Sequence, residues 1–269
     1  MPKWIYKALV LVFAVIFLIS GGLLLNYYVK DSQAEESFEN IAEIVEQVKN
    51  TRPTVQPGET DPTVELVAVQ HPVTGDTVMV LPEYAQVFTE NPDTVGWICI
   101  DGTRVNYPVM HRPEEKDFYL YKDFYKKYSS NGSIYIHEEC DVFAPSDNVT
   151  IYGHRMNSGA MFADLLKYKD AEFFNAHPHI QFDTLQQRSY YVVMSVFTIS
   201  SSINNGFQYH QFVDAANEEE FDSFVQQCQI RALYDTGITA QYGDKLITLS
   251  TCEFGDSNRR VVVVAKQIP

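Results

Sequence analysis

The sequence predicts a mainly β protein: an eight-stranded, closed or nearly closed barrel with peripheral helices, preceded by an N-terminal transmembrane helix. Short β runs dominate the chain beyond Gly96, and one long apolar run lies near the amino end. The 269 residues include 17 Tyr and 17 Phe, which favours β-rich packing. Hydrophobic residues make up 45% and charged residues 20%, which excludes a disordered, collagen-like or coiled-coil protein.

The apolar run, from Ala8 to Leu25, holds eighteen residues without a charge, which is near the lower limit for crossing a bilayer. Interfacial tyrosines extend the predicted span to residues 8–29. Lysines precede the run, so we expect residues 1–7 in the cytoplasm and the remainder outside a single-pass cell-membrane protein. The alternative is a cleaved signal peptide. The bulky residues after the run make a poor cleavage site and favour a retained anchor.

Residues 30–63 are predicted to form an extracellular helix and a linker. Apolar residues recur at helical spacing over 35–49, and residues 51–63 contain three prolines and a glycine. The folded domain is expected over 64–269. It begins with a hairpin at 64–80 and a short helix at 82–90.

Eight β segments follow, and two helices are predicted among them. The longer helix, at 217–233, precedes the last two strands, and a shorter one is expected around 160–169. The strands are predicted at 97–100, 105–109, 133–136, 148–152, 179–182, 189–198, 245–251 and 260–266.

Charge and cysteine spacing exclude two classes of function. Beyond the first thirty residues the chain carries 35 acidic and 17 basic side chains, which makes nucleic-acid binding a poor hypothesis. The four cysteines form no CxxC pair, so we expect no metal site and no cofactor. Whether any of them form a disulfide is left open.

The carboxyl end contains a candidate nucleophile. Strand alternation places Thr248, Ser250 and Cys252 on one face, and a turn over 253–259 leads to a strand that begins at Arg260. If the two strands pair, Cys252 and Arg260 become cross-strand neighbours, and a guanidinium can stabilise an oxygen that becomes anionic. Arg259 competes for this role, because four consecutive valines carry no face signal.

A thiol needs a base or a cation nearby to react at neutral pH, and histidine is its usual partner. Seven histidines are available. His154 is the strongest candidate, because it follows a β run and a glycine in Ile-Tyr-Gly-His-Arg-Met. By itself this signal is weak.

The combination of IYGHRM, then TLSTC about a hundred residues later, then RRVVVVAK resembles a sortase. The stretches 91–98 and 102–110, and the helix before the last two strands, resemble class B of that family. The resemblance covers roughly residues 82–269. It implies an eight-stranded barrel that cuts a sorting signal near the carboxyl end of an exported protein, and joins the new carboxyl group to an amine of a peptidoglycan precursor. It also implies a location on the outer face of a Gram-positive cell, where members of the family are held.

The resemblance also implies site residues. Cys252 matches the nucleophile, His154 the acid/base and Arg260 the arginine, because the family arginine opens the final strand. Tyr152 and Ser250 match positions that line the substrate groove, and the backbone N–H of Glu253 is expected to assist Arg260 at the oxyanion. The domain over 64–269 is then the catalytic domain, although a hairpin at 64–80 is not expected in the family core.

Two rival functions use the same observations. An exported cysteine peptidase would deliver the acyl group to water, and a noncatalytic surface module would bind a peptide in a barrel groove. An intact Cys–His–Arg set disfavours the second, since binding needs no thiol. The sorting signal, the acceptor amine, the choice among housekeeping, iron-uptake and pilus roles, and the oligomeric state are not specified by the sequence.

Overall fold

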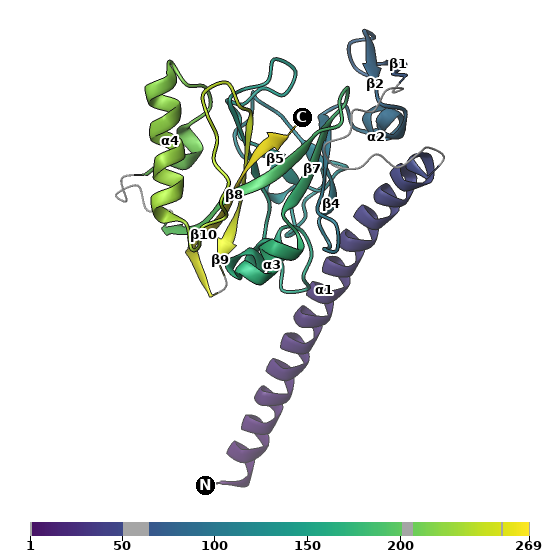
Figure 1. Cartoon of the computed structure of the whole chain (residues 1–269). Coiled ribbons are helices and arrows are strands. Elements are labelled where there is room, and N and C mark those ends of the chain that lie inside the picture. Colours follow the sequence, from purple (N-terminus) through teal and green to yellow (C-terminus); the bar gives the residue numbers. More distant parts are fainter. Residues whose placement is uncertain (1, 51–64, 201–206, 254, 269) are drawn as a thin grey trace.

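The computed structural model describes residues 2–50, 65–200, 207–253 and 255–268. Its centre is a closed barrel with the strand order β10-β8-β7-β3-β4-β5-β6-β9 (Figure 1). This confirms the predicted eight-stranded barrel. The strands are β3 Thr94–Cys99, β4 Asn106–Met110, β5 Ile134–Ile136, β6 Asn148–Tyr152, β7 His179–Thr184, β8 Tyr190–Ser200, β9 Leu246–Glu253 and β10 Asp256–Ile268.

Two pairs of neighbouring strands run parallel, β4 with β5 and β6 with β9. The pairing of β6 with β9 is the one that matters for function. Tyr152 at the end of β6 is in register with Ser250 of β9. Because parallel strands end at the same edge, the residues that follow Tyr152 and Ser250 lie at one rim of the barrel.

The valines of β10 show why this strand carries no face signal in the sequence. Val263 and Ala265 belong to the core inside the barrel. Val262 and Val264 belong to a second apolar cluster, which also contains Phe221, Phe224, Val225 and Cys228 of α4 (Glu218–Arg231). Both faces of the strand are therefore buried. The helix predicted at 217–233 is confirmed, and the side chain of Asn217 caps its first turn.

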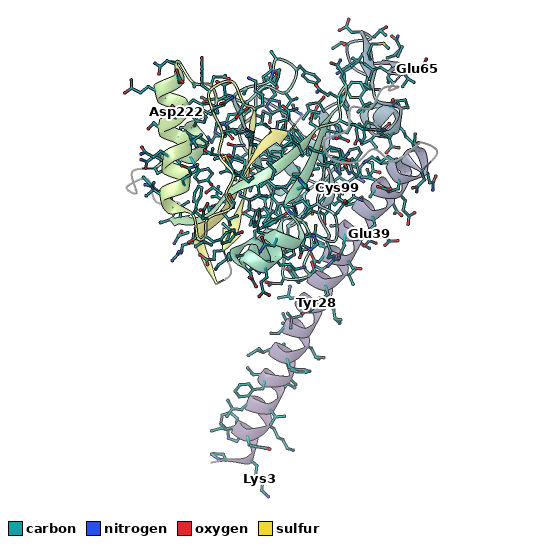
Figure 2. All side chains as sticks on the ribbon, viewed as in Figure 1. Lys3, Tyr28, Glu39, Glu65, Cys99 and Asp222 are labelled. Atoms are coloured by element: carbon teal, nitrogen blue, oxygen red, sulfur yellow. The ribbon has the colours of Figure 1, made fainter. Side chains whose placement is uncertain are left out.

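The amino end is one helix, α1 (Lys3–Lys49), rather than the separate membrane and amphipathic helices expected from the sequence (Figure 2). Its apolar side chains are exposed as far as Val29. From Asp31 onward one face is buried against the barrel, through Phe38, Ile41 and Val45. The polar residues between the two apolar segments continue the helix because they contain neither proline nor glycine.

The apolar half of α1 is a candidate membrane span by length and composition. The predicted linker at 51–63 lies outside the described residues. After it, β1 (Val67–Gln70) and β2 (Thr77–Val80) form the expected hairpin, which is a separate two-stranded sheet.

Short helical segments fill the connections of the barrel. The predicted helix at 82–90 is η1 (Pro82–Tyr84) followed by α2 (Ala85–Glu90). The helix expected around 160–169 is a 3-10 helix, η3 (Ala163–Lys169), so its start and its type both differ from the prediction. The remaining segments are η2 Phe118–Tyr121, α3 Ala171–Ala176 and η5 Tyr209–Gln211.

Candidate active site

Cys252 lies next to the end of β9, and its cross-strand partner on β10 is Arg260. This confirms the pairing predicted from the sequence. The predicted turn over 253–259 is wrong: β10 begins at Asp256, which pairs with Glu253, and the register shifts between Asp256 and Arg260. The extra residues on β10 form a bulge, and bulges re-aim side chains at barrel rims.

The two adjacent arginines have different surroundings. Arg259 forms an ion pair with Glu253 (Nε to Oε2, 2.9 Å) and donates to the hydroxyl of Thr198 at 2.7 Å. Arg260 is half-buried and lines a cavity at the rim. The bulge and the strand alternation thus direct one guanidinium to the surface and the other toward the rim cavity.

His154 follows β6 at the same rim. Gly153 before it packs so closely that a Cβ atom there would lie 2.4 Å from Ile134 Cδ1 and 2.7 Å from Phe162 Cδ2. The backbone N–H of Phe162 donates to the carbonyl of His154 at 2.9 Å. Tight packing on one side and this hydrogen bond on the other therefore fix the backbone that carries the imidazole.

The imidazole of His154 contacts the segment around Leu120. Its Nε2 atom lies 2.7 Å from the carbonyl oxygen of Leu120, and its ring centroid is 5.4 Å from that of Tyr121. A carbonyl oxygen only accepts, so Nε2 carries a proton and Nδ1 is the nitrogen that gains and loses one. Burial lowers the pKa of His154, Arg260 lowers it further by charge repulsion, and the Leu120 carbonyl opposes both by raising it.

The rim cavity has a volume of about 200 Å³. Tyr152, Tyr209 and Arg260 line it, together with polar and charged groups of the neighbouring loops. The hydroxyl of Tyr209 lies 2.7 Å from Ser250 Oγ, which ties η5 to β9. The other residues that line the cavity are Lys116, Asp117, His137, Glu138, Ser200, Phe207, Gln208 and His210.

The expected substrate-binding residues differ in their placement. Tyr152 lines the cavity, whereas Ser250 is buried behind it and contacts Tyr209. The carboxylate of Glu253 forms ion pairs with Lys169 and Arg259 and is not part of the cavity lining. The part of Glu253 that adjoins the Cys252–Arg260 pair is therefore its backbone.

Sequence reasoning missed three groups at this site: the Leu120 carbonyl, the Tyr121 ring and the Tyr209 hydroxyl. A backbone carbonyl leaves no trace in a sequence. The tyrosines belong to a chain with seventeen of them, so residue type alone did not single them out.

The three cysteines other than Cys252 lie in surroundings that raise their pKa. All four are unpaired. Burial raises the pKa of Cys99 to about 11 and that of Cys140 to about 12, and it also raises the pKa of Cys228. Those three thiols are therefore protonated at neutral pH. Within the described residues, no cluster of three or more His, Cys, Asp or Glu side chains could hold a metal ion.

A family model for the sortase domain matches residues 98–268, which is more than half of the chain. The chain belongs to the sortase family. Sortase B of Staphylococcus aureus is 29% identical over 191 residues, covering 70% of this sortase and 76% of that protein. Sortase B of Listeria monocytogenes is 28% identical over 163 residues, covering 61% and 64%.

Solved structures agree with the sequence relatives. A crystal structure of sortase B from Bacillus anthracis is 27% identical with a TM-score of 0.70, and covers 90% of this chain and 99% of that one. A Staphylococcus aureus sortase B–substrate complex, at 24% identity and a TM-score of 0.72, shares the fold over 89% of this chain and 98% of that one. This sortase is thus of class B, whose members are cysteine transpeptidases.

Proposed function

We propose that this sortase is anchored in the cell membrane by α1 with its barrel outside, cleaves a carboxyl-terminal sorting signal after a Thr, and transfers the acyl group to an amine of a cell-wall precursor. The register pairing of Cys252 with Arg260, beside the end of the parallel strand that leads to His154, carries the proposal. This register supports the proposal because a thiol, a fixed cation and an imidazole then share one rim.

In the acylation step, the thiolate of Cys252 attacks the carbonyl carbon of the Thr in the sorting signal. The C–S bond forms and the carbonyl oxygen becomes an oxyanion, which the guanidinium of Arg260 and the backbone N–H of Glu253 stabilise. The C–N bond then breaks, and the imidazolium of His154 gives its Nδ1 proton to the leaving amine. A thioester on Cys252 remains.

In the second step, an amine attacks the thioester carbonyl and neutral His154 takes its proton. The C–N bond forms, the C–S bond breaks, and the thiolate of Cys252 is restored. Acylation requires an ionised thiol and a protonated imidazole together. We therefore expect slow turnover with a bell-shaped dependence on pH.

The rim cavity is the proposed entry for the sorting signal. Tyr152 and Tyr209 offer aromatic faces there, and Arg260 joins the cavity to the reacting centre. Ser250 acts through its hydrogen bond to Tyr209, which holds η5 against β9. A peptide bound in this cavity would present its carbonyl beside Arg260.

The test combines single substitutions with analysis of the products. Cys252→Ala should remove both cleavage of a sorting peptide and formation of its amide with an added amine. The matched control is Cys99→Ala, which removes a half-buried thiol elsewhere in the barrel. This variant should retain both cleavage and amide formation. Loss of activity in Cys99→Ala with retention in Cys252→Ala would contradict the proposal.

The identity of the acceptor is tested in the same assay. A transpeptidase gives the amide in proportion to the added amine, at the expense of the hydrolysed acid. If added amine left the acid as the sole product, the chain would be an exported cysteine peptidase. Binding of the peptide without any cleavage would instead indicate a noncatalytic module.

A further inference from the structure

The boundary between the apolar and the packed part of α1 is sharp. Val29 is 52% exposed, and Asp31 is 6% exposed. Lys30 alone lies between the end of the predicted membrane span and Asp31, the first buried residue of α1. The helix is continuous across this point. A continuous helix transmits position and tilt, unlike a flexible linker.

The loop that follows His154 is tied to this membrane-proximal part of α1. Arg104 forms an ion pair with Glu35, which lies four residues, or about 6 Å, beyond Asp31. The same guanidinium donates to the carbonyl of Ser158 at 2.7 Å, and the backbone N–H of Arg104 donates to Asp164 at 2.9 Å.

A second connection runs parallel to the first. The ring of Phe38 on α1 packs edge-on against Tyr107, with 5.7 Å between centroids. The hydroxyl of Tyr107 in turn accepts the backbone N–H of Met161 at 2.9 Å. The loop that follows His154 is therefore fixed to α1 at two positions. Both positions lie in the first turns of α1 beyond the predicted membrane span.

The direction of the strands agrees with these contacts. In Figure 1 the junction of β9 and β10, where Cys252 and Arg260 pair, lies at the end of the barrel toward the free half of α1. The carboxyl terminus and the β1–β2 hairpin lie at the opposite end. Figure 2 places Tyr28 level with the lower end of the barrel.

The charges at this rim are suited to a lipid surface. Although the exported part of the chain is strongly acidic, three carboxylates here form ion pairs: Glu35 with Arg104, Asp164 with Lys167, and Glu253 with Lys169 and Arg259. Lys167, Lys169 and Arg259 are each at least 41% exposed. The rim therefore repels anionic headgroups less than the acidic body would.

We propose that α1 holds the catalytic rim against the outer surface of the membrane at a fixed height, so that the site takes substrates presented at the lipid surface. The proposal rests on the membrane topology proposed above. It assigns α1 and Arg104 a positioning role and makes a lipid headgroup layer the partner of this face.

The direct test measures depth in the full chain, reconstituted in vesicles of phosphatidylethanolamine and phosphatidylglycerol. In a background with both Cys252→Ala and Cys99→Ala, a fluorescent probe is attached at Ser158→Cys or at Val73→Cys. Ser158 is exposed in the loop after His154, and Val73 is exposed at the tip of the far hairpin. A quencher on the lipid headgroups should quench the probe at 158 and spare the probe at 73. Equal quenching, or quenching only at 73, would overturn the proposal.

The functional test lengthens α1. Seven alanine-rich residues inserted between Val29 and Lys30 add about two turns and raise the barrel by about 10.5 Å with little rotation. The same insertion at the β1–β2 tip is the control. Only the α1 insertion should lower the rate on a membrane-embedded substrate, at least about tenfold, because the height no longer matches. Both variants should process a soluble peptide at the parental rate.

An unchanged rate on the membrane-embedded substrate in the α1 insertion would overturn the positioning role. Failure of the parent chain to process even the soluble peptide would instead contradict the proposed function. The quenching experiment is independent of both activity measurements, since it requires no catalysis.

Discussion

His154 is held in surroundings that oppose its charged form. Burial and the nearby guanidinium of Arg260 lower its pKa, and the hydrogen bond to the Leu120 carbonyl only partly compensates. An imidazole with a lowered pKa loses its proton at a lower pH than an ordinary histidine. The imidazolium of His154, the proposed acid of the acylation step, is thus present in a reduced fraction of molecules at neutral pH.

The titration of His154 gives a prediction with a defined sign. NMR of the ring in the free enzyme should show a pKa below the ordinary histidine value. Arg260→Gln removes the charge repulsion and should raise that pKa, although the acylation rate falls. A pKa that stayed the same or fell in Arg260→Gln would contradict this account of the site.

The two arginines should respond differently to removal. Arg260→Ala takes away a proposed oxyanion donor, and kcat should fall by about 10²–10³. Arg259→Ala removes a surface ion pair with Glu253, and kcat should stay within about fivefold of the parent. Peptide cleavage assays on both variants check this, and the reverse order would exchange the roles of the two residues.

The sequence could not separate these arginines by pattern, because the valines after them are buried on both faces of β10. The choice of Arg260 came from resemblance, and the register of β9 and β10 now provides a physical reason for it. The surroundings of His154 were beyond prediction, since they depend on a backbone carbonyl thirty-four residues away.

At the scale of elements, alternation and turn residues were sufficient to predict all eight barrel strands and the helix α4. Boundaries were less predictable where tertiary contacts override local pattern. The bulge that starts β10 at Asp256 is one case, and the 3-10 form of η3 is another. The continuity of α1 was missed because its polar middle lacks the apolar spacing that marks a helix face.

The end of β6 depends on Gly153. A methyl group there would overlap Ile134 and Phe162, so Gly153→Ala should cost about 1–3 kcal/mol of unfolding free energy and lower kcat by displacing His154. Thermal unfolding and peptide cleavage measure the two effects. Adding Ile134→Val, which removes the Cδ1 atom of the closest contact, should restore part of the stability. A Gly153→Ala variant with parental stability and kcat would show that the glycine is not needed there.

At the scale of the whole molecule, one face of the second half of α1 packs into the same apolar core as the barrel strands, although the family model begins at residue 98. Phe38, Ile41 and Val45 are almost completely buried. One helix is thus both the candidate anchor and part of the folded domain. The apolar run predicted an anchor and the sequence motifs predicted the family, but neither predicted this shared use of α1.

Truncation separates these two parts of α1. Removing residues 1–29 should leave the thermal unfolding temperature of the domain nearly unchanged, because those side chains are exposed. Removing residues 1–49 exposes the surface that Phe38, Ile41 and Val45 cover, and each such side chain contributes about 1.5–3 kcal/mol. The longer deletion should therefore lower the unfolding temperature strongly. Equal stability of the two truncations would show that α1 is a mere tether.

The most direct measurement is the mass of the enzyme after brief exposure to a sorting peptide without acceptor amine. An adduct equal to the peptide segment ending in Thr should appear, map to Cys252, and disappear when an amine is added. An adduct on another residue, or turnover with the thiol of Cys252 blocked, would contradict the claim that this thiolate carries the acyl group.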